Sequence, residues 1–278
     1  MKESNPQKCA ALTHRCRAIQ QLSAGLKSSN ETVGQSQYHW AIASCIALRI
    51  QSGFLENGML DSLIFLRLTS ALEKLYFPTY IRSTSLEGAQ QASDHRQGPK
   101  LSVLRTFDSR IVQAGSRSLA SVVVPSSNLL LRQFHIELSQ CFYLFQTGTE
   151  AALDGFGKFY RSILTMPEVA FLGIFDSKDA VAHCLVAHYF ALVLLVNAFV
   201  IGMSPNGHHT AMGKGADWIA LLCRDYNTSD PNHASFRWPL NLTRTIELID
   251  KERTGPSDPM TSSQLLEKIF QQPELFAT

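Results

Sequence analysis

The side chains that could do chemistry in this chain gather around one apolar segment. Asp179 and His183 are four positions apart, and Asn197 follows at two further intervals of seven. On a helix such positions share one face, which predicts a polar line that also includes Phe190. A carboxylate beside an imidazole can charge and orient it for acid–base catalysis, and the same line can anchor a ligand. The alternative is structural, because buried polar groups usually just find a hydrogen-bond partner.

His188 lies on a different face of the same helix, among apolar neighbours. A histidine in such surroundings is usually a core residue that bonds a carbonyl, although it can also act as an acid or a base. We therefore name His183, His188 and Asp179 as the candidate catalytic residues, and the structural interpretation stays open for each.

Aromatic side chains form a second candidate set. Flat rings can line a pocket for an apolar ligand, and they can equally well fill a core. The candidate ligand-binding residues are Tyr189, Asn197, Trp218, Trp238, Phe171, Phe236 and Tyr143.

Other familiar sites have no counterpart in the sequence. It contains no Gly-x-Ser-x-Gly elbow, no phosphate-binding Gly-x-x-x-x-Gly-Lys-Ser/Thr loop and no Gly-x-Gly-x-x-Gly fingerprint. The adjacent His208 and His209 point apart, and no cysteine pair has zinc-binding spacing. We expect no metal and no cofactor.

The elements that must position these residues are helices. Apolar residues recur every three or four positions along most of the chain, and only residues 119–124 resemble a strand. Residues 82–99 are polar with little to bury, which predicts a flexible surface loop. We expect residues 1–278 to form a single all-α domain around a buried central helix.

The central helix is predicted from a segment without charges. No Asp, Glu, Lys or Arg occurs from Val181 to Gly213, and the part that ends at Ile201 is apolar on every side. Such a segment must be buried in a bilayer or in a protein core. Histidine and asparagine side chains at interior depths, and the lack of a flanking basic cluster, favour the core. The sequence therefore predicts no membrane span.

Composition bounds the class of protein. The 278 residues are 45% hydrophobic and 17% charged, with a net charge of +2, and no basic run suggests binding to nucleic acid by this chain alone. Six scattered cysteines and an N-terminus without an apolar stretch predict an intracellular protein, cytoplasmic or nuclear.

Several short motifs resemble one known family. Ala187-His188-Tyr189 lies in the apolar helix, Trp218 lies in the next helix, and Arg237-Trp238-Pro239 follows a polar loop. Upstream, His14-Arg15 lies in one helix and Ala41-Ile42-Ala43-Ser44-Cys45 in the next. The pattern resembles the C-terminal regulatory domain of fungal zinc-cluster transcription factors, especially the sterol uptake control type.

This resemblance implies an all-α fold with an internal hydrophobic cavity, which holds a sterol in some members, and often a homodimer. Only His188, Tyr189, Trp218 and Trp238 occupy recognisable motif positions. The chain departs from the family in lacking the six-cysteine DNA-binding cluster, the basic linker and coiled-coil heptads.

Two functions follow as leading hypotheses. The first is a regulatory domain that binds a lipophilic small molecule, such as a sterol, a terpenoid or a polyketide. The alternative is a free-standing fungal enzyme of secondary metabolism, a cofactor-independent cyclase, isomerase or pericyclase that acts on a lipophilic intermediate in the same cavity. A scaffold that binds only another protein is a third reading.

Overall fold

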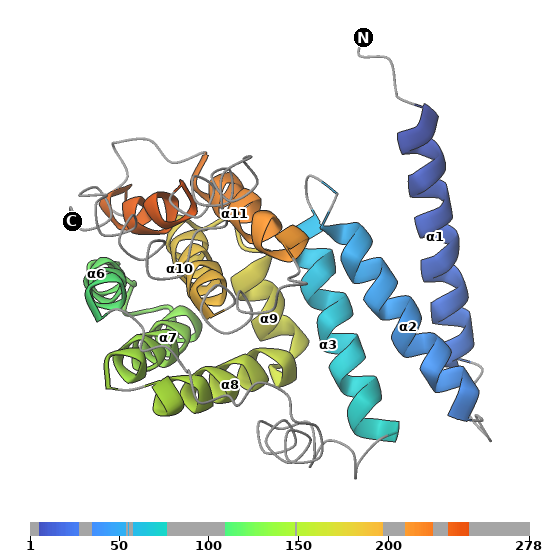
Figure 1. Ribbon diagram of the computed structural model, residues 1–278, viewed down its shortest axis with the longest axis horizontal. Coiled ribbons are helices and arrows are strands. Elements are labelled where there is room, and N and C mark those ends of the chain that lie inside the picture. The colour runs from blue at the N-terminus through green and yellow to red at the C-terminus, as the bar shows by residue number, and fades with distance from the viewer. Residues whose placement is uncertain are drawn as a thin grey trace, which may run out of the picture. The chain divides into compact units, whose positions relative to one another are not determined.

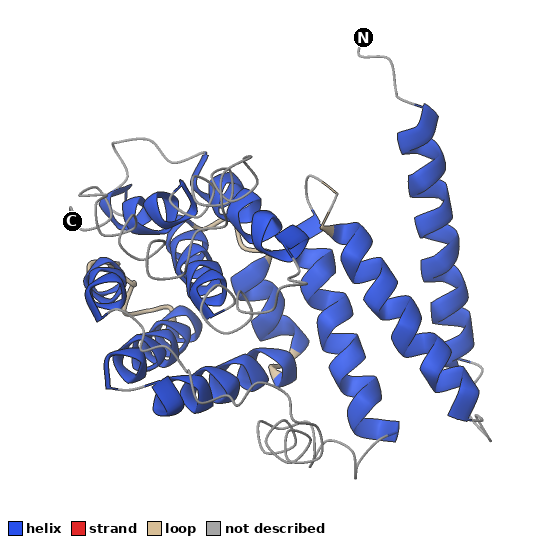
Figure 2. Cartoon of the chain, viewed as in Figure 1, coloured by secondary structure: helices blue, strands red, loops and turns tan. Residues whose placement is uncertain are grey.

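A computed structural model of the protein (Figure 1) describes residues 6–27, 35–53, 55, 58–76, 109–147, 149–196, 209–224 and 233–244. Every regular element within these ranges is a helix, which confirms the all-α prediction (Figure 2). The predicted loop at 82–99 lies outside the described residues. The chain divides into two compact units, residues 1–102 and residues 103–278. The single-domain organisation stays a prediction.

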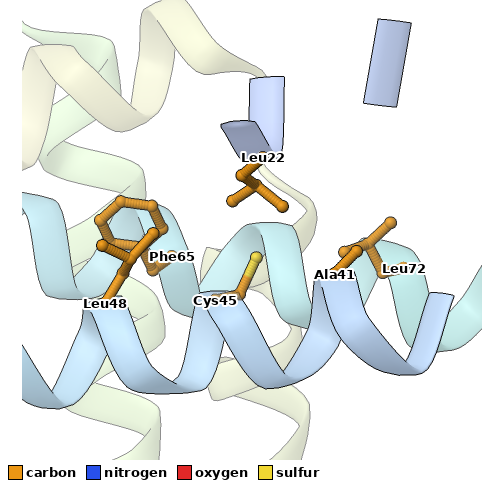
Figure 3. Packing of buried hydrophobic residues seen from close by; sticks show 6 residues of the cluster. All are labelled: Leu22, Ala41, Cys45, Leu48, Phe65 and Leu72. Atoms are coloured by element: carbon orange, nitrogen blue, oxygen red, sulfur yellow. The ribbon is translucent and has the colours of Figure 1, made fainter. Parts of the chain in front are cut away.

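Unit 1 contains three helices, α1 (Pro6–Lys27), α2 (Gln35–Ser52) and α3 (Gly58–Tyr76). Helix α2 packs against both of the others. The core residues recur at intervals of three, four or seven within each helix, so that each helix turns one apolar face inward. Figure 3 shows the six buried residues of this core, Leu22, Ala41, Cys45, Leu48, Phe65 and Leu72.

Arg15 of α1 is a buried charge that links all three helices of unit 1. Its guanidinium donates to the Leu48 carbonyl at 3.0 Å and to the Ser52 hydroxyl at 2.8 Å, both on α2. It also donates to Asp61 Oδ2 on α3 at 2.9 Å and lies 5.4 Å from the Phe65 ring centroid. A buried arginine needs such partners, because an unpaired charge in a core is strongly destabilising.

Unit 2 places α10 at its centre. Helices α6 (Ser109–Ala120), α7 (Leu129–Thr147) and α9 (Glu168–Phe175) contact α10 (Ala180–Val196), and so do α11 (His209–Arg224) and the short 3₁₀ helix η2 (His233–Phe236). Helix α8 (Thr149–Thr165) packs on α7 (Figure 1), and the chain after η2 stays helical to residue 244.

The burial of α10 confirms the prediction of a central apolar helix. Fourteen of its 17 residues are buried, so neighbouring helices cover it on all sides. Among the described residues, no single helix combines the length and hydropathy of a membrane span; α9 and α10 do so only as a pair, with a bend of 93° between them. The predicted continuation from 197 to 201 lies outside the described residues.

Candidate functional site

Asp179 and His183 lie at the N-terminus of α10. The Asp179 carboxylate accepts a hydrogen bond from the Val181 backbone N–H at 2.9 Å, which is the geometry of a helix cap. His183 is half-buried, and its Nε2 lies 2.7 Å from the Ser177 carbonyl in the preceding loop. A carbonyl can only accept, so Nε2 carries the hydrogen in this contact. Both contacts fit the structural interpretation that the sequence left open, and the acid–base role stays a prediction.

His188 is wholly buried in the middle of α10. Its Nδ1 lies 2.8 Å from the Cys184 carbonyl, and its Nε2 lies 3.0 Å from the Ser118 hydroxyl on α6. The first contact requires an N–H on Nδ1, so in the neutral ring Nε2 is the acceptor. The sequence predicted a core histidine or an acid–base group, and these bonds are those of a core histidine.

The charge state of His188 is set by its burial. Desolvation is the largest effect and lowers the pKa of His188 from 6.5 to about 4. The hydrogen bond to the Cys184 carbonyl raises this pKa, and nearby His135 lowers it. The imidazole is therefore neutral near pH 7. A base with so low a pKa is poorly matched to accepting a proton at that pH.

Ser118 connects His188 to η2. Its hydroxyl lies 3.0 Å from the Ser235 carbonyl, and Ser121 donates to the Ser118 carbonyl at 2.6 Å and lies 2.7 Å from the Ser235 hydroxyl. Ser118 thus has one hydroxyl hydrogen and two acceptors within reach, His188 Nε2 and the Ser235 carbonyl. The buried network is short of a donor at this point.

Trp238 covers the His188 ring. The two rings are stacked with centroids 5.8 Å apart and planes at 16°, and the Phe142 ring meets the indole edge-on at 5.5 Å. Trp238 is 3% exposed, yet its Nε1–H has no hydrogen-bond partner within the described part of the chain. Buried indole N–H groups usually find an acceptor, so this one is an exception.

Gly115 of α6 makes this packing possible. A Cβ atom at position 115 would lie 2.5 Å from the Trp238 ring and 2.6 Å from the Phe142 ring. Only glycine leaves the room that both rings occupy. We call Gly115, Ser118, Phe142, His188, Ser235 and Trp238 together the His188–Trp238 site.

Tyr189 and its neighbours form a second group of rings. Tyr189 meets Phe159 of α8 and Phe175 of α9 edge-on at 6.0 and 5.9 Å. Phe171 packs on Phe175 at 4.9 Å, and Trp218 of α11 reaches the group through Phe190. The structure thus brings Tyr189, Phe171 and Trp218 of the predicted set into one aromatic cluster, as pocket walls or as core.

The remaining predicted ligand-binding residues do not lie in this aromatic cluster. Phe236 is buried at the end of η2, next in the chain to the His188–Trp238 site. Tyr143 is 63% exposed, although its neighbour Phe142 is fully buried. One step along a helix turns the side chain by about 100°, and Tyr143 therefore lies on the outer face of α7. Asn197 lies outside the described residues.

Sequence reasoning missed Gly115, Ser118 and Ser235. Ser118 is 70 positions from His188 and Ser235 is 117 positions from Ser118. No local spacing connects such residues, and a serine in a helix has many ordinary roles.

Metal and thiol chemistry find little support in the described ranges. They contain no group of three His, Cys, Asp or Glu side chains placed to hold a metal ion. Burial raises the pKa of the Cys141 and Cys223 thiols to about 12, so both stay protonated and unreactive near neutral pH.

Comparison of the chain with protein-family models, with curated proteins and with solved structures found no match. The resemblance to the regulatory domain of zinc-cluster transcription factors accordingly stays a prediction.

Proposed function

We propose that unit 2 binds an uncharged, mainly apolar small molecule that carries a hydrogen-bond-accepting oxygen, and that the His188–Trp238 site recognises this oxygen. The observation that carries the proposal is the buried Trp238 N–H, which has no acceptor among the residues that the structure describes. Sterols, terpenoids and polyketides are the chemical classes that combine a large apolar body with such an oxygen. A regulatory role, as in the family that the chain resembles, fits a module of this kind.

The energetics favour a ligand at this place. An unsatisfied buried donor costs about 1–3 kcal/mol, which an oxygen from a ligand would recover. Neutral His188 keeps the site uncharged, so a neutral ligand meets no unpaired charge there. The donor-deficient Ser118 can serve a ligand hydroxyl as well, because a hydroxyl both donates and accepts.

The contacts of the three candidate catalytic residues support the enzyme hypothesis less than the Trp238 N–H supports ligand binding. Asp179 caps a helix, His183 bonds a loop carbonyl, and His188 is neutral and bonded at both ring nitrogens. Each of these contacts forms within the protein, without a substrate. We therefore place the ligand-binding function first.

The proposal is tested by titrating the purified chain with a panel of apolar metabolites and reading both the melting temperature and the tryptophan fluorescence. A ligand at 100 times its Kd should stabilise the protein by about 2.7 kcal/mol. Trp238→Phe keeps the ring and removes the N–H, so it should weaken an oxygen-bearing ligand by about 2–10-fold, the value of one neutral hydrogen bond.

Two controls make the result specific. Trp40→Phe alters an exposed tryptophan of unit 1 and should leave affinity unchanged. A hydrocarbon of the same size, without oxygen, should bind wild type and Trp238→Phe equally. The proposal is rejected if no member of the panel raises the melting temperature, or if Trp238→Phe weakens the hydrocarbon as much as the oxygenated ligand.

A further inference from the structure

The polar groups of the His188–Trp238 site are all buried. His188 is 0% exposed, and Ser118 and Ser235 are 4% and 2% exposed. The Trp238 ring lies over the imidazole, and the indole N–H is itself buried. A ligand can therefore reach these groups only when one of the elements around them moves.

The helices around the site are each held by extensive apolar contacts. Fourteen of the 17 residues of α10 are buried, and α7 buries six side chains in unit 2. Helix α6 contributes four buried apolar residues, Ile111, Val112, Ala114 and Leu119. His135 of α7 also bonds the Leu119 carbonyl near the end of α6, at 3.0 Å. Movement of any of these helices would expose a large part of the core to water, which is unfavourable.

Residues 233–244 form a much shorter covering element, which we call the latch. The latch consists of η2 and the helical residues that follow it, and η2 contacts α6 and α10. Its large buried side chains include Phe236, Trp238 and Leu242. Trp238 is the residue that covers His188. Undocking of the latch alone would uncover the site and leave α6, α7 and α10 in place.

The polar contacts under the latch are incomplete while it is docked. The Trp238 N–H has no acceptor within the described ranges. Ser118 has one hydroxyl hydrogen for two acceptors, the Ser235 carbonyl at 3.0 Å and His188 Nε2 at 3.0 Å. Water can satisfy these groups once the latch leaves, so undocking recovers hydrogen bonds that docking forgoes. This gain lowers the cost of local opening at the latch.

We propose that the latch undocks from α6, α7 and α10 as one unit while the rest of unit 2 stays folded, and that this opening admits the ligand to the His188–Trp238 site. Ligand entry by this route rests on the proposed function, whereas undocking itself does not. A ligand oxygen that accepts from the Trp238 N–H supplies the missing bond and favours the docked latch. Binding at the site and closure of the latch are therefore coupled.

A disulfide between the latch and α6 tests the undocking. The Ser121 and Ser235 hydroxyl oxygens are 2.7 Å apart, so the double variant Ser121→Cys with Ser235→Cys can form the bond with little backbone movement. The background is Cys9→Ser with Cys16→Ser, and the oxidised protein is compared with the same protein after reduction. Ser121→Cys alone, treated with the same oxidant, is the matched control because it cannot lock the latch.

Labelling of two native thiols reports the opening, with the rate at each cysteine read by mass spectrometry. Cys184 lies beside His188, with its Sγ 3.8 Å from Nδ1, whereas the Cys141 Sγ lies 3.6 Å from the Gly155 carbonyl, between α7 and α8. In the reduced protein, Cys184 should react at least about 10-fold faster than Cys141, since opening the latch costs less than separating two helices. Oxidation should abolish this difference, and reduction should restore it.

A ligand measurement separates this inference from the proposed function. For an oxygenated ligand identified by the metabolite panel, the association rate should fall at least about 10-fold in the oxidised protein, because the required conformational change is blocked. The latch is overturned if Cys184 reacts no faster than Cys141 in the reduced protein, or if oxidation leaves its rate unaltered. Entry through the latch is overturned if oxidised and reduced protein bind the ligand at equal rates. A panel without any ligand rejects the proposed function, and the labelling of Cys184 still decides whether the latch opens.

Discussion

At the scale of single residues, His188 shows how burial selects between two roles of one side chain. A histidine on an exposed helix face titrates near neutral pH, but His188 has no exposed surface, and its pKa falls to about 4. The neutral ring then has one donor and one acceptor, which the Cys184 carbonyl and the Ser118 hydroxyl engage. Its value to the fold is a hydrogen-bonded link from α10 to α6, covered by the Trp238 ring.

The lowered pKa of His188 predicts that stability falls in mild acid. Above about pH 6.5 the ring is neutral in both the folded and the unfolded protein, so this residue adds no pH dependence. Between pH 6.5 and 4 the unfolded chain binds a proton that the folded chain does not, and the free energy of unfolding decreases by up to about 3 kcal/mol as pH falls.

Urea denaturation at several pH values between 7.5 and 4 measures this decrease. His188→Asn removes the titrating group, so the variant should start less stable at pH 7.5 and lose less stability in acid than wild type does. His14→Asn, at an exposed position of α1, should keep the pH dependence of wild type. An equal pH dependence in wild type and His188→Asn would contradict the assignment of the acid loss to this residue.

At the scale of elements, close approach between helices depends on where glycine stands. Gly115 lets α6 come near enough for the Trp238 and Phe142 rings to fill the space that a Cβ would take. Gly157 of α8 is also helical, and a Cβ there meets nothing within 4 Å. The same residue type has opposite meanings at the two positions, since glycine in an open helix is only a weak helix former.

Alanine substitution of the two glycines should therefore change stability in opposite directions. Gly115→Ala forces the two rings apart and should cost about 1–3 kcal/mol. Gly157→Ala should gain about 0.5–1 kcal/mol from improved helix propensity alone. Urea midpoints compared at constant denaturant slope measure both changes. A gain in Gly115→Ala would show that the rings can shift freely, and that the site is looser than its contacts indicate.

At the scale of the whole molecule, the two compact units have different means of cohesion. Unit 1 is a helix assembly with a small core and an ion pair between buried Arg15 and half-exposed Asp61. Unit 2 wraps five elements around an apolar helix and adds a buried serine–histidine network. Each unit contains buried thiols, Cys45 in the first and Cys141, Cys184 and Cys223 in the second.

These thiols predict how the two units open. In a Cys9→Ser background, a thiol reagent should modify the exposed Cys16 at once, whereas the buried thiols should react only when local unfolding exposes them. Burial also raises the pKa of the Cys45 thiol to about 11, which keeps it protonated and unreactive. Arg15→Ala removes the buried guanidinium that links the three helices of unit 1. It should therefore loosen unit 1 and speed labelling of Cys45 at least about 10-fold.

Labelling of Cys141 and Cys223 should keep its wild-type rate in Arg15→Ala. Mass spectrometry of the digested protein gives the rate at each cysteine. If all the buried cysteines accelerate together, the two units unfold as one cooperative body, and the single-domain prediction from the sequence would gain the support that it lacks.

Much of the helical architecture could be predicted from local patterns. The apolar run around Val181 and the intervals of three and four in the other segments report which face of each helix must leave water, and this depends only on neighbouring residues. Tyr143 shows the limit of the method, because its aromatic type made it a candidate for a pocket while its position on the helix leaves it 63% exposed. Residue type and position around the helix are separate signals, and here the position determined the exposure of the side chain.

The candidate site is formed by contacts between residues that lie far apart in the sequence. By itself, the sequence determined that the protein is helical and that the first part of the charge-free segment, residues 181–196, is buried, because hydrophobic periodicity is a local property of the chain. Only the tertiary structure decided that Trp238 stacks on His188, that Ser118 bonds its ring, and that the indole N–H meets no acceptor in the described part of the chain. Those contacts join residues dozens of positions apart, and they are set by how whole helices pack, which no spacing along the chain encodes.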